Sequence, residues 1–197
     1  MKKIIFTILL WLSVFIVTAQ SDPQDSAWIK DNYTKQEQYI PMRDGIKLFT
    51  AIYIPNDKTE KHPILVTRTP YSCAPYGKEF SSRLWERHWK YYARENYIIV
   101  VQDVRGRWMS EGEFEDVRPF NKNKTGVETD EASDTYDAID WMVKNLPGNN
   151  GNVGVFGISY PGFYSTMAAA SGHPALKAVS PQAPVTDWFM GDDFHHN

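Results

Sequence analysis

Hydrophobic residues gather in short runs along this chain, and more polar segments separate the runs. The clearest run is Y-I-I-V-V-Q at residues 97–102, where apolar side chains follow one another without alternation. A strand with this pattern is buried on both faces, as the strands of parallel sheets are. Runs of this kind predict strands at Tyr39–Met42, Ile46–Ile54, Ile64–Thr67, Tyr97–Gln102, Asn152–Phe156 and Leu176–Ser180.

Longer segments between the runs predict helices at Ser82–Arg94, Ala132–Lys144 and Pro161–Ser171. The second helix is the best marked, because carboxylates precede it and a lysine ends it. Negative charge at the start of a helix and positive charge at its end both favour the helix dipole. Strands therefore alternate with helices after an opening hairpin, whose turn is Arg43-Asp44-Gly45.

This alternation predicts an α/β protein with a mostly parallel sheet, helices on both faces and an antiparallel hairpin in front. Sheets of this type bind ligands at the carboxyl ends of their strands. Ser159 follows the predicted strand that ends at Phe156, while Tyr71 and the loop at 103–113 follow two other strands. We therefore expect these three features on one rim of the sheet.

Composition and charge narrow the classes of protein. With 197 residues, 42% of them hydrophobic, the chain can bury one sizeable core, as one domain or as part of a larger one. The formal net charge is −3 and the basic residues form no stripe, which argues against a nucleic-acid partner. Cys73 is the single cysteine, so we expect no internal disulfide and a packed thiol.

The first 19 residues have the layout of a secretory signal peptide. Lys2 and Lys3 precede an apolar run over residues 4–17, and two small residues follow it. The run is shorter than the roughly 18 residues of a membrane span, which favours cleavage over a retained anchor. We expect a mature chain of residues 20–197, exported to the periplasm or the cell exterior, without a stable membrane anchor.

A single serine, Ser159, stands where a predicted strand gives way to a helix. Gly157 leaves the bend unobstructed, and the N–H groups of the following helix face the same spot. These features suit a nucleophile. Ser159 could instead only cap the helix, and the local pattern leaves both interpretations open. A dinucleotide-binding loop fits poorly, because the nearby glycines lack the G-x-G-x-x-G spacing.

Four motifs, in order along the chain, carry a resemblance to a known family. They are R-T-P-Y at residues 68–71, Q-D-V-R-G-R-W-M-S-E-G-E-F at 102–114, Y-D-A-I-D-W at 136–141 and G-I-S-Y-P-G at 157–162. They look like the CocE/NonD-type serine hydrolases, which include cocaine esterase, glutaryl-cephalosporin acylase and α-amino-acid ester hydrolase, with X-Pro dipeptidyl-peptidase more distant. The α-amino-acid ester hydrolases are the most similar of these. The resemblance implies an α/β-hydrolase fold from about residue 35 onward.

The resemblance also implies a role for each site residue. Ser159 would attack an acyl carbonyl and form an acyl-enzyme, while the Tyr160 backbone N–H and the Tyr71 phenol would stabilise the oxyanion. The activity implied is cleavage of an ester or amide bond in a small-molecule acyl substrate, with no cofactor. An X-Pro dipeptidyl-peptidase-like peptidase and a non-catalytic secreted binding domain are the alternatives.

One detail departs from the usual G-x-S-x-G corner. Pro161 takes the place of the second glycine, which moves to Gly162. Proline is tolerated in the first helical turn, and we expect it to keep Tyr160 out of helical geometry.

Asp192 and Asp193 near the end of the sequence form a second candidate site. In the α-amino-acid ester hydrolases, an aspartate at the position matching Asp193 helps to bind the substrate's α-ammonium group, and Asp192 is the other residue that could match. A plain polar loop is the alternative. His195 and His196 lack spaced partners, so we expect no metal site there.

The remaining members of a catalytic triad follow the serine in this fold, first the acid and then the histidine. In the family both lie beyond position 197. We therefore expect residues 20–197 to be the N-terminal part of a catalytic domain, inactive alone and lacking the rest of that domain, the helical cap and the C-terminal jelly-roll. The sequence is also compatible with a homo-oligomer.

Other charged residues are interpreted as structural. Asp103 and Arg105 are expected to pair with each other at the end of a strand. The five acids between residues 130 and 140 are expected to form a solvated helix face that matches the helix dipole. We do not expect any two of them to act as a catalytic pair.

Overall fold

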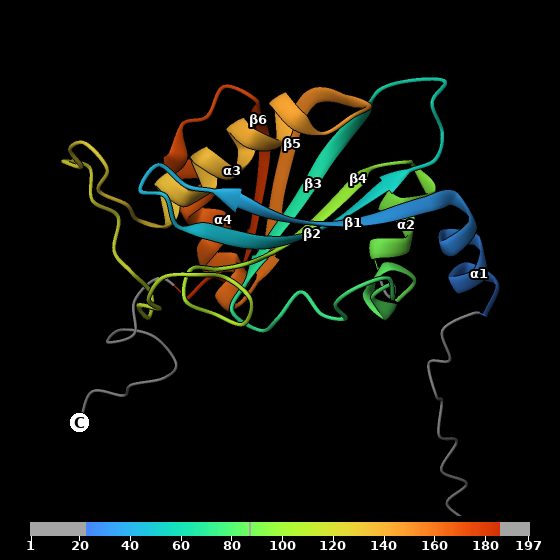
Figure 1. The fold of residues 1–197 in the computed structure, drawn as a ribbon, viewed down its shortest axis with the longest axis horizontal. Coiled ribbons are helices and arrows are strands. Elements are labelled where there is room, and N and C mark those ends of the chain that lie inside the picture. Colours follow the sequence, from blue (N-terminus) through green and yellow to red (C-terminus); the bar gives the residue numbers. More distant parts are fainter. Residues whose placement is uncertain (1–22, 87, 186–197) are drawn as a thin grey trace, which may run out of the picture.

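A mixed sheet of six strands forms the centre of the molecule, with helices on both faces (Figure 1). The computed structural model describes residues 23–86 and 88–185. The elements, in chain order, are α1 (Pro23–Asn32), β1 (Tyr33–Pro41), β2 (Lys47–Pro55), β3 (His62–Thr69), the 3₁₀ turn η1 (Ser82–Leu84), α2 (Trp89–Arg94), β4 (Ile98–Asp103), α3 (Glu131–Asn145), β5 (Asn149–Ile158), α4 (Tyr160–Ser171) and β6 (Leu176–Gln182).

The strand order is β1-β2-β4-β3-β5-β6. The β1–β2 hairpin is antiparallel and joins β4 through a second antiparallel pairing, whereas β4, β3, β5 and β6 run parallel to one another. The predicted architecture of a hairpin followed by parallel strands is therefore confirmed. The loops after β3 and β4 lie along the lower edge of the sheet in Figure 1.

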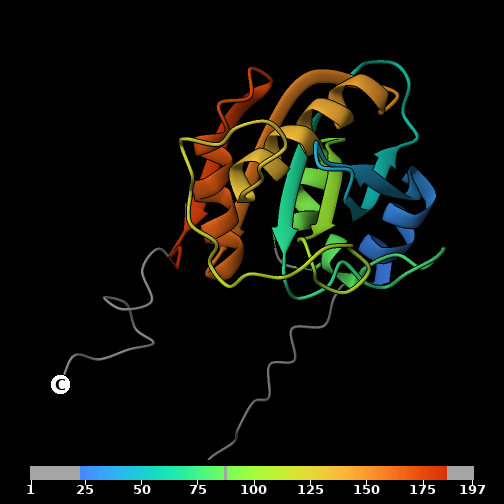
Figure 2. The same ribbon diagram turned by 60° about the vertical axis from the view of Figure 1, so that its left-hand side comes forward.

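Alternating side chains of the central strands enter two different cores. On β4, Ile98 and Val100 pack in the core beneath α3 and α4, while Ile99 and Val101 pack in the core beneath α1, η1 and α2. All four side chains are buried, which is why the sequence of this strand shows no polar face. Figure 2 shows the sheet between the two groups of helices.

A network of buried charges holds α3 against the sheet. Arg68 on β3 is 1% exposed and donates to both the backbone carbonyl and the carboxylate of Glu131 on α3, at 2.9 and 3.0 Å. Asp134, fully buried one turn later, accepts two hydrogen bonds from Arg105 and one from Arg118. Buried ions are stable only when paired and hydrogen-bonded, so the three arginines and two acids depend on one another.

This network corrects two predictions made from the sequence. Of the five acids expected on a solvated helix face, Asp130, Glu131 and Asp134 are buried. Asp130 caps α3 by accepting from Ser133 N, and it also pairs with Lys124. The basic partners come from other elements, so the helix sequence alone cannot show that its acids are buried.

The second correction concerns Asp103 and Arg105, which do not pair with each other. Asp103 accepts a 2.7 Å hydrogen bond from the backbone N–H of Cys73, and Arg105 binds Asp44 and Asp134. Asp103 is the last residue of β4, whereas Arg105 lies two residues further on in the loop, so each side chain meets a different neighbour.

The predicted helix at Ser82–Arg94 is two pieces, η1 and α2, and α1 was not predicted at all. Leu84 and Ala93 both enter the core on the same side of the sheet. Nine residues are about 2.5 helical turns, so one continuous helix would place these two side chains on opposite faces. The break between the pieces lets both be buried.

Within the part of the chain that the structure describes, no helix is long and apolar enough to cross a membrane. The predicted signal peptide at residues 1–19 lies outside the described residues.

Replacing Asp134 with asparagine removes the charge and keeps the shape of the side chain. We expect Asp134→Asn to lower the free energy of unfolding by about 3 kcal/mol, because Arg68 and Arg105 then lose a buried counter-charge. Urea unfolding followed by circular dichroism measures the change. Asp140→Asn is the control on the same helix, since Asp140 makes an exposed pair with Lys144, and it should cost less than about 0.5 kcal/mol. Equal effects of the two substitutions would contradict a structural role for the network.

Candidate active site

Ser159 occupies the sharp corner between β5 and α4, and it is exposed. Its backbone has φ 63° and ψ −121°, a conformation that side-chain-bearing residues rarely adopt. The side chain makes no capping hydrogen bond to the helix. Strain of this kind at an exposed residue is typical of functional sites. The structure therefore favours the interpretation of Ser159 as a nucleophile over that of a simple helix cap.

Hydrogen bonds from the neighbouring strand hold the corner in place. Ser159 N donates to Gln182 O on β6 at 3.0 Å, and Ser159 O accepts from Phe163 N at 3.1 Å. On the other side of β5, the hydroxyl of Thr67 donates to Phe156 O at 2.9 Å. The strand that carries the serine is thus fixed to both of its neighbours directly before the bend.

Two glycines allow the backbone to pass close to itself at this corner. A Cβ at Gly157 would lie 2.2 Å from Pro161 O, and a Cβ at Gly162 would lie 2.7 Å from Gln182 O. Real Cβ atoms do not approach backbone oxygens so closely, so neither position accepts a side chain without movement of the main chain. Gly157 permits the bend itself, and Gly162 permits α4 to pack against β6.

The second glycine of the motif, displaced to Gly162, is therefore required where α4 meets β6. Pro161, which takes its usual position, packs against Gly157. The expectation that Pro161 keeps Tyr160 out of the helix was wrong, because α4 begins at Tyr160. Backbone N–H groups in the first turn of a helix have no partner within the helix. Pro161 lacks this N–H, so it does not disturb the hydrogen bonds of α4.

Tyr71 lies on the loop after β3, and the loop after β4 holds this segment on both sides of the tyrosine. The indole N–H of Trp108 and Nε of Arg107 both donate to Pro70 O, at 2.8 and 3.2 Å. Asp103 accepts from Cys73 N. Tyr71 itself is 56% exposed, so the loop is anchored while its phenol ring is left accessible.

The rings of Tyr71 and Tyr160 meet edge to face, with centroids 6.3 Å apart and planes at 84°. Because Tyr160 follows Ser159 directly, this contact brings the loop after β3 against the first residue of α4. The prediction that Tyr71, the loop at 103–113 and the serine corner share one rim is therefore confirmed.

A cavity of about 400 Å³ opens beside the corner. Gly157, Ile158 and Pro161, which flank the serine in sequence, line it together with Tyr71. The rest of the lining includes Trp89 and Phe156 and the polar residues Arg83, Glu86 and His88. Apolar walls with a few polar groups are usual for sites that bind small organic molecules.

The described histidines do not form a triad with Ser159. His62 begins β3, and because β3 and β5 are parallel it lies at the edge of the sheet opposite the serine. His173 follows α4, about 18 Å along the helix axis from its start. Burial lowers the pKa of His173 even though Asp140 is near. His88 lines the cavity, but it makes no hydrogen bond to Ser159.

Cys73 is buried close to Asp103 and cannot act as an exposed nucleophile. Burial, together with the nearby Asp103 carboxylate, raises the pKa of the Cys73 thiol well above its usual value. Burial likewise raises the pKa of Asp103. The expectation of a packed, unreactive thiol agrees with this environment.

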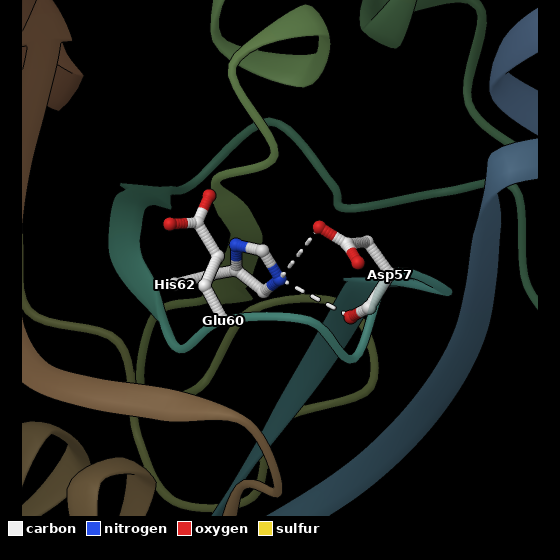
Figure 3. A group of neighbouring side chains, drawn as sticks. All are labelled: Asp57, Glu60 and His62. Carbon is white, nitrogen blue, oxygen red and sulfur yellow. Dashed lines mark hydrogen bonds and ion pairs between the residues drawn. The ribbon is translucent and has the colours of Figure 1, made fainter.

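Asp57, Glu60 and His62 are the three described residues whose ligand atoms lie close enough to share a metal ion, within 4.8 Å of one another (Figure 3). The imidazole Nε2 is already 3.2 Å from the carbonyl of Asp57, and Asp57 Oδ1 accepts from Thr59 N. Because Asp57 and His62 are engaged in the turn before β3, we interpret the cluster as a loop-stabilising contact. It lies at the other end of β3 from Tyr71.

The last candidate site lies beyond the described residues. Asp192, Asp193, His195 and His196 all fall within positions 186–197. The substrate-binding role predicted for the two aspartates therefore stays a prediction.

The sequence is similar to that of a known protein family. Residues 44–197 match the model of the X-Pro dipeptidyl-peptidase (S15) family. The chain belongs to this family. It is 33% identical to cocaine esterase from Rhodococcus sp. (strain MB1 Bresler) over 153 residues, which are 76% of this chain and 23% of the esterase.

Two solved structures share the fold and a substantial part of the sequence. An aminopeptidase from the marine sediment archaeon Thaumarchaeota archaeon is 40% identical with a TM-score of 0.72, and the match covers 90% of this chain and 29% of that one. A selenomethionine-labelled α-amino acid ester hydrolase is 36% identical with a TM-score of 0.70, covering 95% of this chain and 30% of that one. The chain thus spans less than a third of the length of each of these relatives. The structural agreement confirms the predicted α/β-hydrolase fold.

Substituting Gly157 tests whether the close contact with Pro161 sets the corner. We expect Gly157→Ala to lower the free energy of unfolding by about 3 kcal/mol, because a methyl group there must displace backbone. Gly154→Ala is the control in the same strand, since its Cβ would meet Leu65 Cδ1 at 3.4 Å and Ala178 O at 3.9 Å, both without a clash, and it should cost less than about 1 kcal/mol. Urea unfolding of both variants provides the measurement, and a tolerated Gly157→Ala would refute the proposed constraint.

Proposed function

We propose that this chain carries the nucleophile and the oxyanion site of a serine hydrolase that cleaves an ester or amide bond through a seryl acyl-enzyme. The carrying observation is Ser159 itself, exposed at a strained corner with no helix-capping hydrogen bond. Membership of a hydrolase family and the similarity to an esterase and an aminopeptidase support the proposal. Ser159 would attack the acyl carbonyl, and its proton would pass to a histidine acting as general base.

The Tyr160 backbone N–H and the Tyr71 phenol are proposed to stabilise the oxyanion. What supports this pairing is the ring contact between the two tyrosines and the place of Tyr71 in the wall of the cavity. A phenol is a neutral donor on a stiff ring, so it can remain oriented before charge develops. The N-terminus of α4 adds a favourable dipole at the same position.

The acid and the histidine of the triad are proposed to come from other parts of a longer polypeptide. In support, no described histidine is hydrogen-bonded to Ser159. A second, apolar hollow of about 350 Å³ on the sheet, lined by residues of β3, β5 and β6 such as Leu65 and Val179, also suits a further covering element. Residues 1–19 are proposed to export the protein to the periplasm or the cell exterior as a signal peptide.

An α-amino-acyl substrate is the more specific part of the proposal. Two of the similar structures are named for substrates with a free amino group, an aminopeptidase and an α-amino acid ester hydrolase. A carboxylate at Asp193 would pair with the α-ammonium group and select such substrates by charge as well as by shape. The alternative within the family is an X-Pro dipeptidyl-peptidase-like peptidase, and the alternative outside it is a binding domain without activity.

A fluorophosphonate probe distinguishes the enzyme from the binding domain. In the complete product of the reading frame, we expect labelling that disappears in Ser159→Ala, because the probe reacts with activated serines. In-gel fluorescence and mass spectrometry of the labelled peptide report the outcome. Absence of labelling in the complete, folded protein would instead favour the binding domain.

Removing the hydroxyl of Tyr71 tests the second oxyanion donor. We expect Tyr71→Phe in the complete protein to lower kcat by about two to three powers of ten, the usual effect of losing one oxyanion donor. Tyr76→Phe is the matched control, since Tyr76 lies in the same loop but bonds Ser72 and does not line the cavity. A change below about threefold in Tyr71→Phe would show that the residue only packs.

Asp193→Asn tests the α-ammonium site. We expect a larger loss of kcat/KM on α-amino esters than on simple acetyl or benzoyl esters, because only the first carry a cation for Asp193 to bind. Asp192→Asn is the comparison, and a selective loss there would assign the role to Asp192. Equal losses on both substrate classes in both variants would remove the ammonium site from the proposal.

A further inference from the structure

The phenol of Tyr160 makes two hydrogen bonds to one exposed loop. It donates to Asp116 Oδ1 at 2.5 Å and accepts from the backbone N–H of Val117 at 2.8 Å. The Tyr160 side chain is otherwise surrounded by aromatic rings, stacking on Tyr164 at 5.2 Å and meeting Phe163 at 6.0 Å. A phenylalanine would make the same ring contacts but would lose both bonds to the loop.

The loop that holds Tyr160 is itself fixed to the buried charge network. Arg118, two residues after Asp116, donates to Glu131 Oε1 at 2.9 Å and to Asp134 Oδ2 at 3.2 Å. The loop is therefore anchored at Arg118 to α3, and Asp116 presents its carboxylate from a position that α3 determines. Burial, with the Asp116 carboxylate beside it, raises the pKa of Tyr160 to about 12, which keeps the phenol protonated as a donor at neutral pH.

We propose that Asp116 is a positioning residue of the oxyanion site. By holding the Tyr160 ring, it fixes the start of α4, where the Tyr160 backbone N–H emerges, and it supports the edge-to-face contact through which Tyr71 is placed. Both proposed oxyanion donors thus depend on one ring and on the carboxylate that holds it. This inference rests on the proposed function, because it assigns Asp116 a role in that reaction.

The effect of Asp116 is expected in the chemical step and not in substrate binding. Oxyanion donors act on charge that appears only in the transition state, so a displaced donor lowers kcat and leaves KM nearly unchanged. Small displacements of catalytic groups commonly cost one to two powers of ten. A merely structural aspartate would instead change the unfolding temperature without this separation of kcat from KM.

The test compares variants of the complete product of the reading frame, with p-nitrophenyl acetate as the substrate. We expect Asp116→Ala and Tyr160→Phe each to lower kcat by about 10- to 100-fold, with KM within about threefold of the wild-type value. The double variant should be about as slow as Tyr160→Phe alone, because that substitution already removes the bond to Asp116. Asp116→Asn keeps an acceptor oxygen and should restore kcat to within about threefold of the wild-type value.

Glu115→Ala is the matched control, since Glu115 is the exposed neighbour of Asp116 and makes no hydrogen bond or ion pair within the described residues. It should leave kcat unchanged. The positioning role is refuted if Asp116→Ala keeps the kcat of the wild-type protein. It is also refuted if the lower kcat of Asp116→Ala is accompanied by a lowered unfolding temperature and Asp116→Asn fails to restore kcat. Ser159→Ala separates the two proposals. If it retains activity, the proposed function fails, whereas an inactive Ser159→Ala beside an unaffected Asp116→Ala refutes only the positioning role.

Discussion

The close passage of backbone at Gly157 and Gly162 is the constraint on which the site depends. Gly157 lies against Pro161 O and Gly162 against Gln182 O, at separations that exclude a Cβ at either position. The strand can therefore turn within two residues and send α4 back along β6. Ser159 is held at positive φ because the chain on both sides of it is fixed by these contacts and by the hydrogen bond to Gln182. The hydroxyl is exposed as a consequence of how the two elements pack.

The buried charges form a second constraint, and they connect with the first. The guanidinium of Arg68 lies 5.6 Å from the ring centre of Tyr164, which stacks on Tyr160. Arg68 also binds Glu131, and Glu131 binds Arg118 beside the loop that holds the Tyr160 phenol. Tyr160 is therefore supported from beneath by stacked rings and from the side by an anchored loop. Removing one charged partner from a buried network of this kind is strongly destabilising, so each of these residues helps to hold the geometry around Tyr160.

The sequence predicted the strands that are apolar on both faces, and it missed the features whose burial depends on residues far away in the chain. Strand β4 was recognisable because both of its faces are apolar, and the serine corner was recognisable from its glycines. By contrast, Asp130, Glu131 and Asp134 look solvated in the sequence of α3, because their partners Arg68, Arg105, Arg118 and Lys124 come from elsewhere in the chain. The break between η1 and α2 was missed for a related reason, since only the sheet requires Leu84 and Ala93 to face the same side.

Asp116 shows why part of a site escapes prediction from local patterns. It is an exposed acid in a polar loop, two residues beyond the motif at 102–114, and has no regular spacing to the serine. Its relation to Ser159 runs through the Tyr160 phenol, which only the folded chain brings within reach. A tyrosine directly after a nucleophile has two separable parts, a backbone N–H that any residue would supply and a hydroxyl that only tyrosine supplies. The hydroxyl bonds the loop at 116–117, so the proposed orientation of that N–H depends on a carboxylate that does not line the cavity.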